Sequence, residues 1–216
     1  MIAAVIFDLD GVIIDSEPIW EDVRRTLLAA YKLPYPADAT RAIMGMSSPE
    51  WSAYLHDVLR VPLPASEINV RVVAGVAAAL EARLPLFAGA VEAVRRIAER
   101  VPVAIASSSN RSLIELAVER AALKEAFTAL VSSEEVDRGK PEPDVYLRAA
   151  ELLGVEPGHC GAVEDSSNGL RAAHAAGAFV VAVPNASFPP SPAALALADR
   201  IVTGIAAIDA STFGLH

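Results

Sequence analysis

Two aspartates two residues apart, Asp8 and Asp10, are the first side chains of the chain that could do chemistry together. They follow an apolar run over residues 3–7, which is typical of a short buried strand. Side chains at positions i and i+2 of an extended segment point the same way, so both carboxylates leave the end of the strand together. Like charges that close repel each other, and the pair needs a cation, a shared proton or plain solvent. A solvated turn after an edge strand therefore stays open as an alternative.

Three further polar clusters follow apolar segments later in the chain. They are residues 107–110 (SSSN), residues 138–144 (RGKPEPD) and the pair Glu164 and Asp165. The carboxyl ends of parallel strands meet at one edge of a sheet, so we expect these clusters to surround a common pocket with Asp8 and Asp10. Each cluster taken singly has a simpler explanation, as a helix cap, a solvated lysine or an acidic turn.

The combined set of groups fits phosphoryl transfer. Carboxylates from separate strand ends make an all-oxygen site, which suits Mg²⁺. A serine hydroxyl, the ammonium group of Lys140 and backbone N–H groups near a helix start suit a phosphoryl group. A metal, a free carboxylate and phosphate donors together indicate a carboxylate nucleophile.

The elements that position these groups fall into two kinds. Between residues 17 and 83 we find helical patterns and no convincing strand, whereas strands and helices alternate after residue 84. Alternation predicts an α/β fold with a doubly wound parallel sheet, which the first strand must join across the helical block. We therefore expect a core domain of residues 1–15 and 85–216, with residues 16–84 as an inserted, all-helical cap.

Composition narrows the class of protein. The chain has 216 residues and a formal net charge of −9, which disfavours nucleic acid as a partner because phosphate backbones need a basic face. No apolar run is long enough for a membrane span, and the N-terminus lacks the pattern of a signal peptide. The single cysteine, Cys160, fits a reducing interior and a place in the core. We expect a cytoplasmic monomer that binds neither nucleic acid nor membrane.

The chain resembles the haloacid dehalogenase superfamily, in its β-phosphoglucomutase-like branch with a helical cap. Four stretches carry the resemblance, in matching order and spacing. They are residues 7–12 (FDLDGV) with 15–17 (DSE), 106–110 (ASSSN), 139–144 (GKPEPD) and 163–166 (VEDS). The resemblance covers essentially the whole chain.

The resemblance implies a role for each acidic residue. Asp8 would be the nucleophile that forms an aspartyl-phosphate, and Asp10 the general acid and then the general base. Asp8 and Asp165 would bind Mg²⁺ together with the backbone carbonyl of Asp10. Glu164 would be a further metal ligand or a partner of one.

The resemblance also implies how the phosphoryl group is held. Ser107 and Lys140 would contact its oxygens, with Ser108 and Asn110 beside them, and Lys140 would offset the repulsion among the carboxylates. Gly11 would let the backbone turn closely past the phosphate. The implied enzyme is a Mg²⁺-dependent phosphatase acting on a small phosphorylated metabolite, such as a sugar or polyol phosphate.

Two departures from this branch bear on the reaction. Its sugar-phosphate mutases carry a histidine where this chain has Trp20, and an arginine just after the glycine of the cap, where this chain has Met46 after Gly45. A mutase needs a clamp for a second phosphate, so phosphatase is favoured over hexose-phosphate mutase. A catalytically silent phosphate-binding protein is the remaining alternative. We expect Trp20 and Trp51 in the core of the cap, and a position facing the substrate stays open as an alternative for Trp20.

Overall fold

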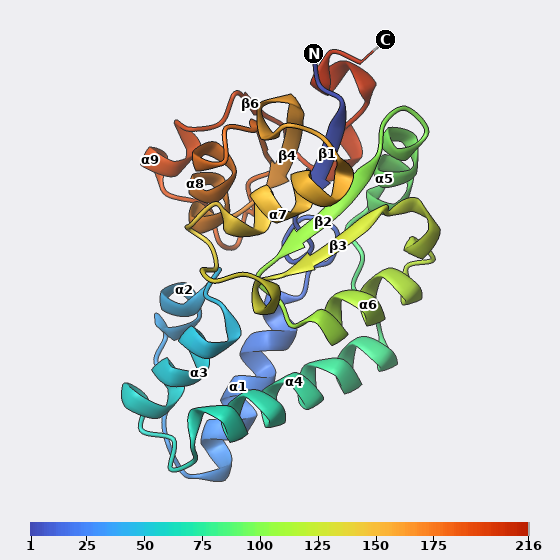
Figure 1. Cartoon of the computed structure of the whole chain (residues 1–216). Helices are drawn as coiled ribbons and strands as arrows, with labels where there is room; N and C mark the ends of the chain where they lie inside the picture. The colour runs from blue at the N-terminus through green and yellow to red at the C-terminus, as the bar shows by residue number, and fades with distance from the viewer. Residues whose placement is uncertain (216) are drawn as a thin grey trace.

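Six parallel strands form one sheet in the upper part of the molecule in Figure 1, in the order β3-β2-β1-β4-β5-β6. The computed structural model describes residues 1–215. The predicted doubly wound parallel sheet is confirmed, and β1 joins it between β2 and β4. The strands are β1 (Ala4–Phe7), β2 (Val103–Ser107), β3 (Ala129–Ser132), β4 (Cys160–Glu164), β5 (Phe179–Ala182) and β6 (Arg200–Ile201).

The register brings the ends of the central strands level with one another. Phe7 of β1 lies opposite both Ile105 of β2 and Val163 of β4. The polar residues that follow β1, β2 and β4 therefore emerge at the same edge of the sheet. This edge faces the helices at the bottom of Figure 1.

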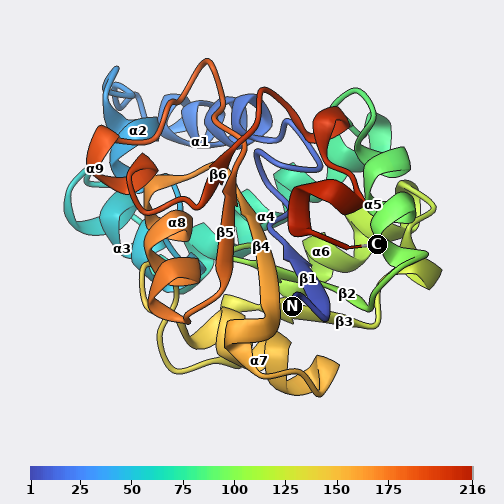
Figure 2. The same ribbon diagram turned by 90° about the horizontal axis from the view of Figure 1, so that it is seen from above.

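Helices cover both faces of the sheet, as the view from above shows (Figure 2). Val5 and Phe7 of β1 point into a hydrophobic core with α5 (Ala90–Ala98) and α6 (Arg111–Arg120). Their neighbours Ala4 and Ile6 point into a second core on the other face. That second core holds α7 (Asp144–Leu153), α8 (Ser167–Ala175) and the short α9 (Pro192–Leu195). The strands read as continuous apolar runs because both faces are buried.

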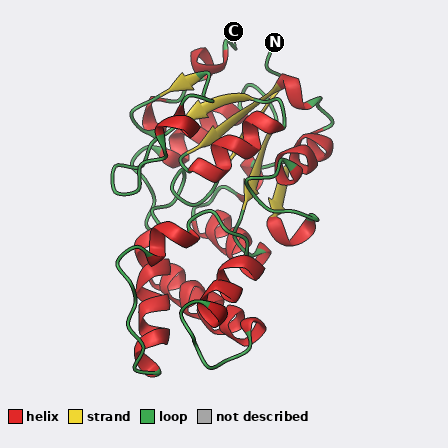
Figure 3. Cartoon of the chain, turned by 90° about the vertical axis from the view of Figure 1, so that its left-hand side faces the viewer, coloured by secondary structure: helices red, strands yellow, loops and turns green. Residues whose placement is uncertain are grey.

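Five helices separate the neighbouring strands β1 and β2 along the chain, and the first four of them form the helical insertion. They are α1 (Glu17–Ala30), α2 (Ala39–Ile43), α3 (Ser48–Asp57) and α4 (Ala65–Ala82). Figure 3 shows this lower part of the molecule without a strand. The apolar stripe of α4, from Ile68 to Leu80 at intervals of four residues, is fully buried, as expected for an amphipathic helix. The domain boundaries at residues 16 and 84 stay a prediction.

Local sequence explains where these helices begin and end. Ser47 and Glu50 form a reciprocal capping box that starts α3. Gly45, two residues before Ser47, has a φ of +76°, a left-handed conformation that favours glycine. Helix α2 has only five residues, because it is confined between Pro36 and this glycine turn.

The two connections between the sheet and the helical insertion run side by side. The N–H of Asp15 donates to the carbonyl of Pro85 at 2.7 Å, and the N–H of Phe87 donates to the carbonyl of Ile13 at 3.0 Å. Ile14 and Leu86 form an isolated antiparallel bridge at the same place. The helical insertion thus leaves the sheet and returns to it at one point. Within residues 1–215, no helix is both long and apolar enough to cross a membrane.

Candidate active site

A buried ion cluster lies at the carboxyl ends of β1 and β4. The ammonium group of Lys140 donates to Asp8 Oδ1 at 2.7 Å and to Glu164 Oε1 at 2.5 Å. Its third hydrogen bond goes to the backbone carbonyl of Ala106 at 2.9 Å. All three N–H groups of Lys140 are therefore used, and its charge holds two carboxylates together.

Glu164 is saturated by contacts within the protein. Its Oε1 also accepts a hydrogen bond from the hydroxyl of Tyr146 at 2.7 Å. Its Oε2 accepts from the backbone N–H groups of Asp165 and Ser166, at 3.1 and 3.3 Å. A Cβ atom at Gly169, on the first turn of α8, would collide with this carboxylate. These contacts favour Glu164 as a partner that fixes the other charged groups.

Asp165 has an acceptor that the protein does not fill. Its carboxylate is buried, and Oδ2 has no hydrogen-bond partner among residues 1–215. Oxygens of Asp8, Glu164 and Asp165 lie within 4.8 Å of one another. An unfilled, buried carboxylate oxygen beside two other carboxylates is what a divalent cation would stabilise, so the donor set fits a metal.

Gly11 serves this cluster through its missing side chain. Its φ is +82°, and a Cβ atom at this position would collide with the carboxylate of Asp165. The glycine therefore leaves room for the acidic cluster and does not line the central cavity.

Electrostatics of the buried cluster favour an added cation. Burial raises the pKa of both Asp8 and Asp165 above the ordinary value, and the neighbouring charge of Glu164 adds to the shift. Burial alone would lower the pKa of Lys140, but the carboxylates of Asp8 and Glu164 outweigh it and raise this pKa. Burial also raises the pKa of Tyr146, so its hydroxyl stays protonated as a donor. A divalent cation would lower the pKa of the carboxyl groups that it touches.

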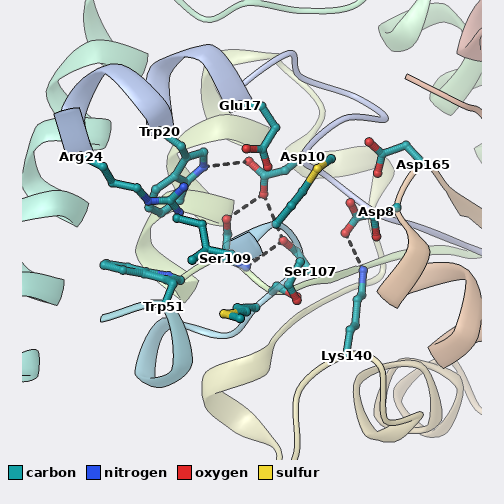
Figure 4. A pocket seen from close by; sticks show the side chains of 16 residues that line it. Asp8, Asp10, Glu17, Trp20, Arg24, Trp51, Ser107, Ser109, Lys140 and Asp165 are labelled. Carbon is teal, nitrogen blue, oxygen red and sulfur yellow. Dashed lines mark hydrogen bonds and ion pairs between the residues drawn. The ribbon is translucent and has the colours of Figure 1, made fainter. Parts of the chain in front are cut away.

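Asp10 lies across the cavity from this cluster and accepts hydrogen bonds from both parts of the molecule (Figure 4). From the side of the helical insertion, Ser16 Oγ and Trp20 Nε1 donate to its Oδ1, the latter at 3.4 Å. From the loop after β2, Ser109 Oγ donates to its Oδ2 at 2.7 Å and Ser107 Oγ at 3.3 Å. The orientation of the Asp10 carboxylate is thus set by the sheet and the helical insertion together.

The serine loop, residues 107–110 at the end of β2, contacts both the cavity and neighbouring elements through its side chains. Ser107 accepts a hydrogen bond from the N–H of Ser109 at 3.0 Å and faces the cavity. Ser108 donates instead to the carbonyl of Gly45 at 3.1 Å. Asn110 accepts from Ser48 Oγ at 2.7 Å, and its amide donates to Glu134. The last two contacts tie the loop to the helical insertion and to the 3-10 turn after β3.

The predicted residues separate into those at the cavity and those behind it. The cavity between the sheet edge and the helical insertion measures about 50 Å³. Of the residues predicted from the sequence, Asp8, Asp10, Ser107, Ser108, Lys140 and Asp165 line it. Three others, Gly11, Asn110 and Glu164, do not reach its wall and instead support residues that do.

Helix α1 supplies a part of the cavity wall that the sequence reasoning missed. Glu17, Trp20 and Arg24 all line the cavity, and Trp51 of α3 lies beside them (Figure 4). The two tryptophans are buried as expected, but they form the wall as well as the core. The signal was present in the spacing, because residues i, i+3 and i+7 of a helix share one face. A charged glutamate and arginine on an otherwise apolar helix face would have singled it out.

Comparisons with known proteins agree with this geometry. A family model described as haloacid dehalogenase-like hydrolase matches residues 2–177. Bifunctional riboflavin kinase/FMN phosphatase of Arabidopsis thaliana is 31% identical over 215 residues, covering 99% of this chain and 56% of that protein. The chain therefore spans little more than half the length of this relative.

Two further proteins are similar over most of their length. Hexitol phosphatase B of Escherichia coli strain K12 is 35% identical over 192 residues, which cover 85% of this chain and 84% of that protein. The crystal structure of β-phosphoglucomutase from Clostridium difficile superimposes with a TM-score of 0.85, covering 98% of this chain and 95% of that one. Its sequence identity of 20% limits this second likeness to the fold.

Proposed function

This chain belongs to the haloacid dehalogenase-like hydrolases and is an enzyme that hydrolyses phosphoric monoesters, and on this premise we propose that it is a Mg²⁺-dependent phosphatase of small sugar or polyol phosphates. The observation that carries the proposal is the position of Asp8. Its carboxylate leaves the end of β1 inside a cluster of Lys140, Glu164 and Asp165, and it faces Asp10 across one cavity.

The proposed reaction has two displacements at phosphorus. Asp8 attacks the phosphorus atom, the bond from phosphorus to the alcohol oxygen breaks, and Asp10 gives that oxygen a proton. A water molecule then attacks the aspartyl-phosphate, Asp10 takes the proton of the water, and the bond from phosphorus to Asp8 breaks. Inorganic phosphate and the free alcohol leave, and both aspartates return to their starting state.

The contacts of Asp10 support its use as both acid and base. Serine hydroxyl groups donate or accept hydrogen bonds as needed, so Ser16 and Ser109 can hold Asp10 in either protonation state. Lys140 supports the other aspartate, since its charge stabilises the Asp8 carboxylate and would stabilise a phosphoryl group in its place.

The acidic cluster would hold the Mg²⁺ ion. Its ligands in our proposal are Asp8, Asp165 and the backbone carbonyl of Asp10, and Glu164 fixes Asp165 through its backbone N–H. When bound, the ion supplies charge stabilisation to the phosphoryl oxygens and neutralises the repulsion among the carboxylates. Ser107 and the backbone N–H groups of the serine loop would contact the same oxygens.

The small size of the cavity supports a small substrate that enters when the helical insertion moves. A water molecule needs about 10–15 Å³ of such a cavity. A volume of about 50 Å³ therefore holds a few water molecules, but not a hexitol phosphate. We propose that the insertion opens to admit the substrate and closes to exclude bulk water, in the cytoplasmic setting predicted above.

Hexose-phosphate mutase is the second candidate, because Arg24 lines the cavity. The residue after Gly45 is not an arginine, but Arg24 places a guanidinium group in the wall by another route. Conversion of β-glucose 1-phosphate to glucose 6-phosphate, measured against release of phosphate, separates the two reactions.

Replacing Asp8 by asparagine tests the proposal. Asp8→Asn should abolish phosphate release from a panel of phosphomonoesters, since an amide is no nucleophile. Asp22→Asn, an exposed change on α1, is the matched control and should leave the rate unaltered. Treatment with EDTA should stop turnover, and added Mg²⁺ should restore it. Turnover by Asp8→Asn, or by the metal-free enzyme, would refute the mechanism. No release by the unaltered protein would favour a silent phosphate-binding protein.

A further inference from the structure

The wall of the cavity formed by α1 carries two buried polar groups that the proposed reaction does not use. Oε2 of Glu17 and Nε of Arg24 have no hydrogen-bond partner among residues 1–215. Both side chains are at least nine-tenths buried, with residue exposures of 9% and 5%. A buried acceptor or donor without a partner is unfavourable, so two of them in one cavity wall indicate that a ligand supplies their hydrogen bonds.

Two tryptophan side chains hold Arg24 in place. Its guanidinium carbon lies 4.8 Å from the ring centre of Trp20 and 5.3 Å from that of Trp51. No salt bridge of Arg24 is found in the part of the chain that the structure describes. The two indole rings are in edge contact with each other, with centroids 5.8 Å apart, and the guanidinium group lies against both of them. These contacts hold the guanidinium group and leave its Nε–H without a partner in the described chain.

The charge of Glu17 decides which kind of ligand suits this wall. Glu17 and Arg24 lie on the same face of α1 and line the same cavity, so their opposite charges act on each other. A second phosphate or a carboxylate would meet Arg24 but would also face Glu17 and Asp10. A hydroxyl group accepts a hydrogen bond from a guanidinium and donates one to a carboxylate, so it satisfies both orphaned atoms.

We propose that Glu17 and Arg24 form a subsite for neutral hydroxyl groups of the leaving alcohol, which selects sugar or polyol monophosphates over bisphosphates. The subsite rests on the proposed phosphatase function and makes its substrate class more specific. It assigns the arginine in the cavity to hydroxyl recognition instead of to a second phosphate.

The test compares two substrates that differ only in their hydroxyl groups. Sorbitol 6-phosphate carries hydroxyl groups along a six-carbon chain, and hexyl phosphate carries none. Arg24→Met keeps a similar apolar stem against the tryptophans. It should lower kcat/KM for sorbitol 6-phosphate by about 10- to 100-fold, the effect expected for a lost charged hydrogen bond. For hexyl phosphate the change should stay under about threefold.

A neighbouring arginine provides the matched control. Arg25 lies on the same helix with half of its side chain exposed, and it pairs with Glu21. Arg25→Met should leave kcat/KM unaltered for both substrates. Equal losses of Arg24→Met on both substrates, or no loss on either, would overturn the subsite.

Glu17→Gln tests the charge balance independently of Arg24. At pH 8, above the pKa of about 7 of this carboxyl group, the substitution removes a negative charge and should raise the ratio of kcat/KM for fructose 1,6-bisphosphate over sorbitol 6-phosphate by at least about threefold. An unchanged ratio would contradict the role of Glu17. If Arg24→Met does not fold, Arg24→Lys replaces it. This variant keeps the charge, loses the planar fork, and should still lose activity on sorbitol 6-phosphate selectively.

Binding separates failure of the subsite from failure of the proposed function. If the unaltered protein releases no phosphate from either monoester, the phosphatase proposal fails. Calorimetry with sorbitol 6-phosphate then still tests the subsite, because Arg24→Met should bind about tenfold more weakly. Equal affinity of the two proteins would overturn it.

Discussion

The buried carboxyl group of Glu17 should make the protein less stable as the pH rises. An acidic residue with a lowered pKa has the opposite effect. Burial raises its pKa to about 7 from an ordinary value of 4.5, although the charge of Arg24 acts the other way. The change that isolates this effect is Glu17→Gln, because a glutamine of nearly the same shape does not titrate.

The sign and size of the effect follow from linkage. Between pH 4.5 and about 7 the folded protein keeps a proton on Glu17 that the unfolded chain has lost. The stabilisation from the neutral carboxyl group is therefore complete below pH 4.5 and is lost as the pH rises through about 7. A difference of about 2.5 in pKa, at about 1.4 kcal/mol each, amounts to a loss of about 3 kcal/mol in the free energy of unfolding.

Urea unfolding at pH 5, 6, 7 and 8 in the presence of EDTA measures this loss. The free energy of unfolding of the unaltered protein, minus that of Glu17→Gln, should fall by about 1.4 kcal/mol per pH unit up to neutrality and then level off. Other titrating groups are shared and cancel in the difference. Asp22→Asn, on the exposed side of α1, should give a difference that does not change with pH. A difference for Glu17→Gln that is equally flat would refute the burial argument.

Three further changes act on the acidic cluster. Gly11→Ala should lower the melting temperature and the activity more than Gly177→Ala does. Both glycines have a φ near +80°, but only a Cβ atom at Gly11 would collide with Asp165. Equal losses of the two variants in a melting assay would contradict the collision. Lys140→Met leaves two buried carboxylates unpaired and should cost about 3–5 kcal/mol in urea unfolding, and a loss below about 1 kcal/mol would show that the ion pairs are not essential. Mg²⁺ added to EDTA-treated protein should raise the melting temperature, but not that of Asp165→Asn. An equal rise in both would place the ion elsewhere.

The alternation of strands and helices was sufficient to predict the fold. The parallel sheet and its helices follow from apolar runs of four or five residues that separate amphipathic segments, and β1 must join a sheet whose other strands lie beyond residue 100. The same rule places Asp8, Asp165 and the serine loop at one edge, because parallel strands end together.

The inner surface of the helical insertion could not be predicted in the same way. Helix periodicity shows that Trp20 and Arg24 share a face, but the direction of that face depends on how α1 packs against α4 and on the path of both connections. The different tasks of Ser107 and Asn110 also depend on this packing, since Asn110 bonds to Ser48 of the helical insertion. The bond between Asn110 and Ser48 joins residues 62 positions apart, and no local pattern records it.

The paired connections at Ile14 and Leu86 give the chain a modular architecture. Since the helical insertion starts and ends at one hydrogen-bonded point, a different set of helices could replace it without changing the order of the strands. The sheet would keep Asp8, Lys140 and Asp165. The exchanged helices would bring a new wall in place of Glu17 and Arg24, and they would also have to replace the hydrogen bond from Trp20 to Asp10. On the proposed function, the choice of substrate could then be altered through the insertion alone, provided that the contact to Asp10 is kept.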